Sequence, residues 1–262
     1  MDNLSVALNE LIDESIIYEF FGFYSLQNDD ALAKRRKKGN VEAKKILPKA
    51  YKKASFISSF PFVKGVYVSG SLSKGYFDED GDIDYFVVTK PNRLWIARTF
   101  LILYKKVFLL NSKKYFCVNY FIDDEQLEIK DKNIFTATEI ATLLPMVNKH
   151  IYQDFITTNN WIKEYYPNFE ALDTSQTNEV KKVWLGLTIE KFFSGNLGDK
   201  FDAFFMKKTL KRWQKKFHHL TNEEMELLMR TNRRVSKHHP SDFQTKVLAK
   251  YKQKLNEYGI EG

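Results

Sequence analysis

Two short segments of the chain carry residues whose types and spacing suit phosphate and metal chemistry. The glycine-rich segment 69–75 follows the apolar run 66–68, and Asp82 and Asp84 lead into the apolar run 85–88. Alternate residues of a strand project to the same face, so the two carboxylates can point at one place. Carboxylates held side by side repel each other unless a cation lies between them. The pattern therefore predicts a phosphate-binding loop beside a divalent-metal site.

The glycine-rich segment supplies three candidate phosphate contacts. Backbone N–H groups after Gly70 and the Ser71 hydroxyl can hold phosphate oxygens, and glycine permits a close approach of the backbone. Lys74 can neutralise phosphate charge as a flexible cation. Gly70 and Gly75 have the spacing of a Walker A loop, but an aromatic pair at 76–77 stands where that loop needs Lys and Ser or Thr. We therefore predict a phosphate loop of another kind.

The order of these elements resembles the nucleotidyltransferase superfamily, which includes DNA polymerase beta, poly(A) polymerase and the aminoglycoside nucleotidyltransferases. The signature is an apolar strand, Gly-Ser, a spacer and an Asp-x-Asp strand, found here at 66–68, 70–71, 72–81 and 82–84. The resemblance covers about residues 45–150. Segments 116–121 and 136–140 are also similar to a little-characterised bacterial branch, which names no substrate.

The resemblance implies transfer of a nucleotide from a nucleoside triphosphate such as ATP to a hydroxyl acceptor, with release of pyrophosphate. Asp82 and Asp84 would coordinate Mg²⁺, with Mn²⁺ as an alternative, and act as catalytic and metal-binding residues. Gly70, Ser71 and Lys74 would bind the substrate phosphates. The acceptor and the preferred base are not implied.

The third carboxylate of the family pattern is missing from its expected place. On the predicted strand 115–122, the matching slot holds Asn119, which can be a neutral metal ligand and a substrate-binding residue but cannot accept a proton. Glu128 lies between two apolar residues and is the candidate catalytic base in its place. The alternative for Glu128 is an exposed acid on an edge strand.

Two alternatives to the enzyme stay open. Asp82 and Asp84 can instead be a turn acid and a strand-edge acid, given the acidic segment 78–81 just before them. An acid inside the apolar run 83–88 is costly without a metal or a partner, which favours the site. The second alternative keeps the fold but lacks a base because of Asn119: a catalytically silent nucleotide- or RNA-binding module.

Composition indicates a soluble, cytoplasmic protein that does not enter a membrane. Of 262 residues, 44% are hydrophobic, which is ample for a packed core without covalent cross-links. The single cysteine, Cys117, excludes an internal disulfide and is expected to be an inert core thiol. The most apolar run, 94–110, contains three basic residues, and the first residues lack the pattern of a secretory signal.

Positive charge is concentrated near the C-terminus. The chain has a net charge of +8, and residues 181–262 contain 18 Lys and Arg against 9 Asp and Glu. Such asymmetry predicts a polyanionic partner, so the acceptor can be an RNA bound by a basic C-terminal domain. A lysine-rich solvated surface is the equally weighted alternative.

Hydrophobic periodicity and cap signals predict an α/β (α+β) fold: a small mixed sheet of the nucleotidyltransferase type flanked by helices, with an all-helical C-terminal part. We expect three regions: N-terminal helices over 1–60, a catalytic core over 61–166 and a basic helical domain over 179–262. The predicted helices cover 4–24, 28–60 (kinked at Pro48), 91–110, 136–148, 149–165, 179–194, 199–219 and 241–258, and a short strand covers 127–129.

Overall fold

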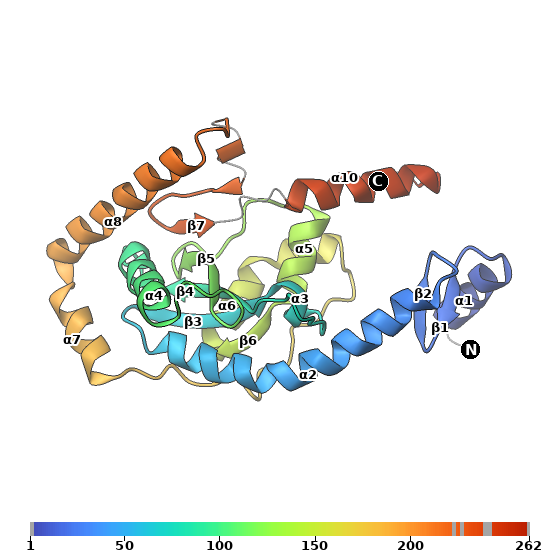
Figure 1. Ribbon diagram of the computed structural model, residues 1–262, viewed down its shortest axis with the longest axis horizontal. Coiled ribbons are helices and arrows are strands. Elements are labelled where there is room, and N and C mark those ends of the chain that lie inside the picture. Colours follow the sequence, from blue (N-terminus) through green and yellow to red (C-terminus); the bar gives the residue numbers. More distant parts are fainter. Residues whose placement is uncertain (1–2, 222–223, 226–227, 238–242, 261–262) are drawn as a thin grey trace.

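A five-stranded mixed sheet lies at the centre of the protein in the computed structural model (Figure 1). The structure describes residues 3–221, 224–225, 228–237 and 243–260. The strands are β3 (Val63–Ser69), β4 (Asp84–Thr89), β5 (Cys117–Asp123), β6 (Leu144–Val147) and β7 (Val235–Lys237). They are ordered β6-β3-β4-β5-β7; β4 and β5 run parallel and the other neighbours run antiparallel.

Helices cover both faces of this sheet, as the predicted fold class requires. The helices that lie around the sheet include α2 (Asp30–Ser58), α4 (Leu94–Phe108), α5 (Ile134–Ala141), α6 (Lys149–Thr158) and the 3₁₀ helix η1 (Asn160–Glu164). α2 and α4 pack on one face, and α5 and α6 pack on the other. The predicted linker 168–178 has no helix or strand except a single bridge at Asn178.

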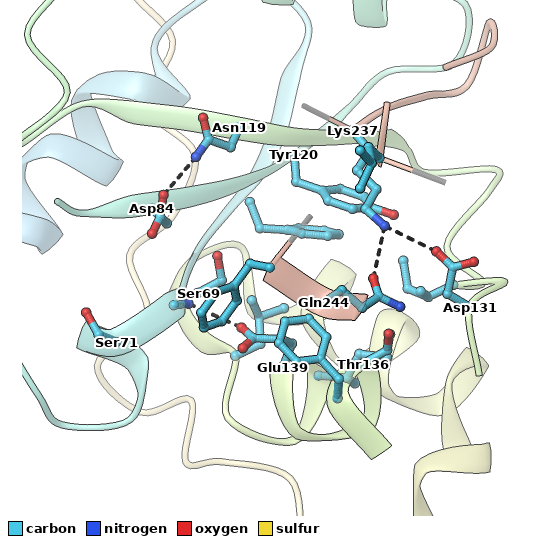
Figure 2. A pocket seen from close by; sticks show the side chains of 18 of the residues that line it. Ser69, Ser71, Asp84, Asn119, Tyr120, Asp131, Thr136, Glu139, Lys237 and Gln244 are labelled. Atoms are coloured by element: carbon cyan, nitrogen blue, oxygen red, sulfur yellow. Dashed lines mark hydrogen bonds and ion pairs between the residues drawn. The ribbon is translucent and has the colours of Figure 1, made fainter. Parts of the chain in front are cut away.

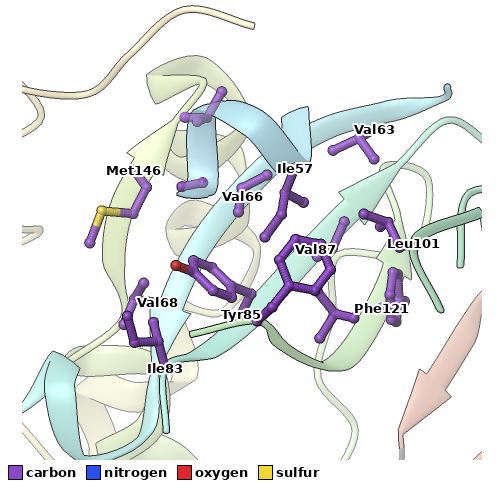
Figure 3. Packing of buried hydrophobic residues seen from close by; sticks show 14 of the residues in the cluster. Ile57, Val63, Val66, Val68, Ile83, Tyr85, Val87, Leu101, Phe121 and Met146 are labelled. Carbon is purple, nitrogen blue, oxygen red and sulfur yellow. The ribbon is translucent and has the colours of Figure 1, made fainter. Parts of the chain in front are cut away.

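The central strands are buried on both faces, which explains their continuous apolar sequences. On the α2 side, Val66, Tyr85 and Val87 belong to the larger core cluster (Figure 3). On the α5 side, Tyr67 and Phe86 belong to a second cluster, in which most of the buried residues are aromatic or branched aliphatic. Because side chains alternate along each strand, they pack into two separate cores, and the alternation fixes which residues face the α5 side.

The C-terminal part is mainly helical, as predicted, and it also supplies one strand to the sheet. Its helices are α7 (Trp184–Phe192), α8 (Gly195–Lys216) and α10 (Phe243–Glu257). α8 packs against α4, and α10 contacts α5 (Figure 1). β7 pairs with β5, although the sequence predicted no strand there. Ser241, the predicted start of the last helix, lies outside the described residues.

The predicted N-terminal helix 4–24 is wrong in its second half. Helix α1 (Asn3–Asp13) is followed by a small hairpin of β1 (Tyr18–Phe20) and β2 (Phe23–Ser25). The two residues of its turn, Phe21 and Gly22, have φ angles of +56° and +78°. Such angles belong to a two-residue hairpin turn, and a helix cannot continue through them. The hairpin and α1 lie at the far end of α2, away from the sheet (Figure 1).

Two further predicted elements need correction. Residues 127–129 form no strand, because the chain leaves the sheet after β5. The helix predicted over 136–148 is α5, which begins after the Asn133 cap, ends at Ala141 and is followed by β6. Pro145 in β6 cannot donate a hydrogen bond, and it is tolerated because β6 is an edge strand.

Within the described ranges, no helix combines the length and the apolar character that crossing a membrane requires.

Candidate active site

The glycine-rich loop lies directly after β3. Gly70 has a φ of +72° and begins the one-turn helix α3 (Gly70–Ser73). A Cβ atom at Gly70 would lie 2.7 Å from Asp84 Oδ2, closer than real side chains approach. Glycine therefore allows both the left-handed backbone turn and the close approach of the Asp84 carboxylate to the loop.

Asp82 and Asp84 lie side by side at the start of β4. Asp84 is the first residue of the strand, and Asp82 precedes it in a segment without regular structure. This segment is held to the start of β5 and the residues just before it, because Ile83 N–H donates to Lys114 O at 3.0 Å and Ile83 O accepts from Cys117 N–H at 3.1 Å. One oxygen of each carboxylate and Cys117 Sγ lie within 4.8 Å of one another. The structure thus brings together the two aspartates that the sequence singled out.

Asn119 contacts this pair from the neighbouring strand. Its Nδ2 donates a hydrogen bond of 2.8 Å to Asp84 Oδ1 (Figure 2). The pairing of β4 and β5 shifts by one residue at this point, which makes Asn119 the extra residue of a β-bulge. The bulge directs the amide at Asp84, so Asn119 orients the carboxylate and cannot take a proton from a substrate.

Glu139 of α5 reaches the glycine-rich loop from across the site. Its Oε2 accepts a hydrogen bond of 3.3 Å from Gly70 N–H, and its Oε1 lies 2.8 Å from Lys74 Nζ. Lys74 Nζ also donates to Gly70 O at 3.1 Å. The sequence did not single out Glu139, which stands three residues after Thr136, the spacing of a capping box at the start of the predicted helix 136–148. The cap of α5 is Asn133 instead, which leaves the Glu139 side chain available for the loop.

Glu128, the acid predicted as the base, is not brought to the aspartate pair. Its carboxylate forms an ion pair with Lys132 at 2.9 Å, and 47% of its side chain is exposed. It is absent from the residues that line the cavity described below. Its apolar neighbours Leu127 and Ile129 pack against the α5-side core, so the apolar-acid-apolar pattern reflects a coil lying on the protein surface.

Comparison with family models accounts for this arrangement. Residues 48–147 match the model of the nucleotidyltransferase domain. The chain contains a nucleotidyltransferase domain. The matched region of this domain runs from within α2 to the end of β6 and includes the loop at Gly70, both aspartates, Asn119 and Glu139. A search of curated proteins and a search of solved structures found no match to the chain. The match of residues 48–147 to the domain model confirms the resemblance to the nucleotidyltransferase superfamily that was read from the sequence.

Asp84 has a raised pKa within the nucleotidyltransferase domain. Burial raises the pKa of the Asp84 carboxyl from 3.8 to about 7, and the charges of Asp82 and Glu139 also raise it. Hydrogen bonds from Cys117 and Asn119 lower it in part. An ionised Asp84 therefore lacks sufficient positive charge around it, and a bound cation would supply that charge.

Cation binding is expected to weaken as the pH falls below about 7, because a protonated Asp84 competes with the metal. Below that pH, Mn²⁺ affinity should fall by up to about tenfold per pH unit. Fluorescence or paramagnetic-resonance titrations with Mn²⁺ at pH 6, 7 and 8 measure this. Without metal, the raised pKa of Asp84 also means that the free energy of unfolding declines as the pH rises from about 4 to about 7. Mn²⁺ affinity that is constant over pH 6–8 would contradict the pKa assigned to Asp84.

The donor atoms suit a hard divalent cation. Asp82 and Asp84 offer carboxylate oxygens, which Mg²⁺ and Mn²⁺ prefer. Burial, followed by the charges of Asp84 and Asp82, raises the pKa of the Cys117 thiol. Cys117 therefore stays a neutral thiol that donates to the carboxylates, and a thiol is a poor ligand for Mg²⁺. Two carboxylates leave most of the coordination sphere of such a cation for phosphate oxygens and water.

A cavity of about 500 Å³ connects the loop, the aspartates and α5. Its polar end is formed by Ser69, Gly70, Ser71, Asp82, Asp84, Asn119 and Glu139. One face of α5, with Thr136, Glu139, Ile140 and Leu143, forms a wall at helical spacing. The volume is within the range of small-molecule sites, about 300–1,000 Å³. The polar end is therefore continuous with the rest of this cavity.

Proposed function

We propose that the protein transfers a nucleoside monophosphate from a nucleoside triphosphate to a hydroxyl acceptor and releases pyrophosphate. One observation carries the proposal: Gly70 N–H, the Asp84 carboxylate and the Glu139 carboxylate converge on one end of a cavity of ligand size. A backbone donor suits phosphate, and paired aspartates suit the metal that accompanies it. This is the combination that nucleotidyl transfer needs.

Asp82 and Asp84 would hold Mg²⁺ or Mn²⁺, and their fit is supported by the unbalanced charge of the partly buried Asp84. The metal, when bound, supplies positive charge to the triphosphate and to the leaving pyrophosphate. The protein's own contribution is to orient this site. Asn119 fixes one oxygen of Asp84 at 2.8 Å, and the glycine at position 70 leaves room for the other oxygen.

Gly70 N–H, Ser71 and Lys74 would bind the phosphates of the substrate. In the described structure, the Glu139 carboxylate binds two of these groups: it lies 3.3 Å from Gly70 N and 2.8 Å from Lys74 Nζ. A phosphate oxygen entering the loop would displace the Glu139 carboxylate, since both are anions that compete for the same donors. Binding of the triphosphate would thus free Glu139 within the cavity.

We assign the proton-accepting role to Glu139 in place of Glu128. The transfer forms a bond between the acceptor oxygen and the α-phosphorus, breaks the bond from the α-phosphorus to the leaving oxygen, and moves the hydroxyl proton to a base. Four acids line the cavity: Asp82, Asp84, Asp131 and Glu139. Asp131 is engaged by Arg230 at 2.8 Å, and the two aspartates are needed for the metal. Glu139 is the acid that remains.

A second candidate function is nucleotide binding without catalysis. Two observations favour it: Asn119 is neutral where the family pattern places an acid, and Glu139 is bound to Lys74 and the loop. If phosphate binding does not release Glu139, the site has no base and remains a nucleotide-binding module. The two functions differ in whether label from a triphosphate becomes attached to another molecule.

The test uses the full chain with each α-³²P-labelled NTP and Mg²⁺ or Mn²⁺ in cell extract. We expect one base to dominate and the label to enter one fraction: RNA, protein or small molecules. Label in RNA would support a role for the exposed basic residues of α8, which include Lys207, Lys208, Lys211, Lys215 and Lys216. Label bound to the protein but transferred to no fraction, for all four NTPs, would support the binding module.

A further inference from the structure

The cavity continues from the aspartates into a second, aromatic end that the metal and phosphates do not need. This end is lined by rings and aliphatic side chains: Phe86, Tyr120, Ile129, Phe135, Phe155, Leu228 and Phe243. Phe86 and Tyr120 lie stacked, with ring centroids 5.0 Å apart and an interplanar angle of 16°. Phe135 and Phe243 meet edge to face at 6.0 Å. A flat apolar ligand would find both ring faces and ring edges here.

Beyond the rings, the cavity ends in a second polar group (Figure 2). Lys237 of β7 donates to Gln244 Oε1 at 3.1 Å and lies 3.4 Å from Asp131 Oδ2. The other oxygen of Asp131 lies 2.8 Å from Arg230 Nη1. The Lys237 side chain is only 9% exposed. Buried charges of this kind are costly unless paired, so a ligand here meets donors and acceptors in fixed positions.

We propose that the aromatic end is the nucleobase subsite of the triphosphate, with Lys237, Asp131 and Gln244 contacting the edge of the base. This deepens the proposed function and rests on it. The subsite includes Lys237, Phe243 and Gln244, which lie outside the matched domain at 48–147. The C-terminal part therefore completes the substrate site of the domain.

The shape and chemistry of the cavity favour the nucleobase of the triphosphate over the acceptor molecule at this end. A nucleoside triphosphate has an anionic chain at one end and a flat heteroaromatic ring at the other, and the cavity has matching ends in the same order. Phe86 lies two residues after Asp84 on the same face of β4, so one ribose unit can join the two ends. A base edge offers both donors and acceptors, as do Lys237, Asp131 and Gln244 together. An acceptor needs to bring only one hydroxyl to the polar end.

The test compares a ligand that has a nucleobase, an NTP, with a ligand that has none, inorganic tripolyphosphate. Calorimetry with the full chain, Mg²⁺ and no acceptor measures the Kd of each NTP and of inorganic tripolyphosphate. Lys237→Met should weaken binding of the preferred NTP about ten- to hundredfold, because a charged hydrogen-bonding group is lost. Tripolyphosphate binding should change by less than about twofold, since that ligand has no base to contact Lys237.

Further variants test the subsite independently of Lys237 and provide controls. Gln244→Ala and Phe243→Ala alter partly or largely exposed side chains on α10, so they test the subsite if Lys237→Met fails to fold. Lys250→Met, an exposed lysine on α10 outside the cavity, is the matched control for charge. Gly70→Ala should weaken NTP and tripolyphosphate alike, because it alters the phosphate end.

The outcomes separate the two proposals. Selective loss of NTP affinity in the Lys237 and Gln244 variants supports the base subsite. Equal affinity of the unmodified chain for NTP and tripolyphosphate overturns the subsite and leaves nucleotidyl transfer standing. Unchanged NTP affinity in the folded Lys237 and Gln244 variants does the same. If the unmodified chain binds neither ligand, the proposed function itself fails.

Discussion

Asp84→Asn should abolish nucleotidyl transfer, with a loss of about a thousandfold or more. The substitution removes a metal-binding charge yet preserves the local geometry. An asparagine at this position can still accept the hydrogen bond from Asn119, which joins the two side chains at 2.8 Å in the native protein. The fold should remain intact, so the effect reports on charge.

The thermal stability of the Asp84→Asn variant should increase, although its activity is lost. Burial and the nearby charges of Asp82 and Glu139 raise the pKa of Asp84 to about 7, so its ionised form is destabilised at pH 8. Removing that charge should raise the thermal unfolding midpoint of the metal-free protein at pH 8, as measured by differential scanning calorimetry. Asp80→Asn, at an exposed acid of the preceding loop, is the control and should change neither property. Full activity in Asp84→Asn would remove Asp84 from the active site.

Glu139→Gln should lower the transfer rate by about two to four orders of magnitude, the usual contribution of a general base. The same substitution should not weaken the binding of NTP. Glu139 lies against Gly70 N–H and Lys74 Nζ, so a neutral side chain at this position competes less with the incoming phosphates. The Kd for NTP should therefore stay level or decrease while kcat falls.

Single-turnover kinetics and calorimetry on the same preparations separate these two effects. Glu128→Gln is the matched comparison, because it makes the same change in an acid paired with Lys132 at a half-exposed position. We expect its kcat to be unchanged. If Glu128→Gln is slow while Glu139→Gln keeps the native kcat, the base was correctly predicted from the sequence and the assignment to Glu139 is wrong. If neither variant is slow, the acceptor proton does not pass to either acid.

The sequence alone determined the elements whose residues are close along the chain. Gly70 and the Asp82–Asp84 pair belong to one strand–loop–strand unit, in which short apolar runs and alternation fix where side chains point. The helices on both faces of the sheet also followed from periodicity, because their apolar positions repeat at helical spacing. The place of Asn119 near the aspartates followed from the resemblance to the family, and the structure shows its hydrogen bond to Asp84.

Only the tertiary structure decided which distant residues complete the site. The sequence pointed to Glu128 and not to Glu139, and packing separates the two: α5 places Glu139 against the loop, while Glu128 lies on a coil beside Lys132. Lys237 reaches the cavity because a three-residue strand pairs with β5, and three residues are too few to show a period. Local patterns report backbone preference and burial, whereas contacts between segments far apart in the chain depend on how whole elements pack.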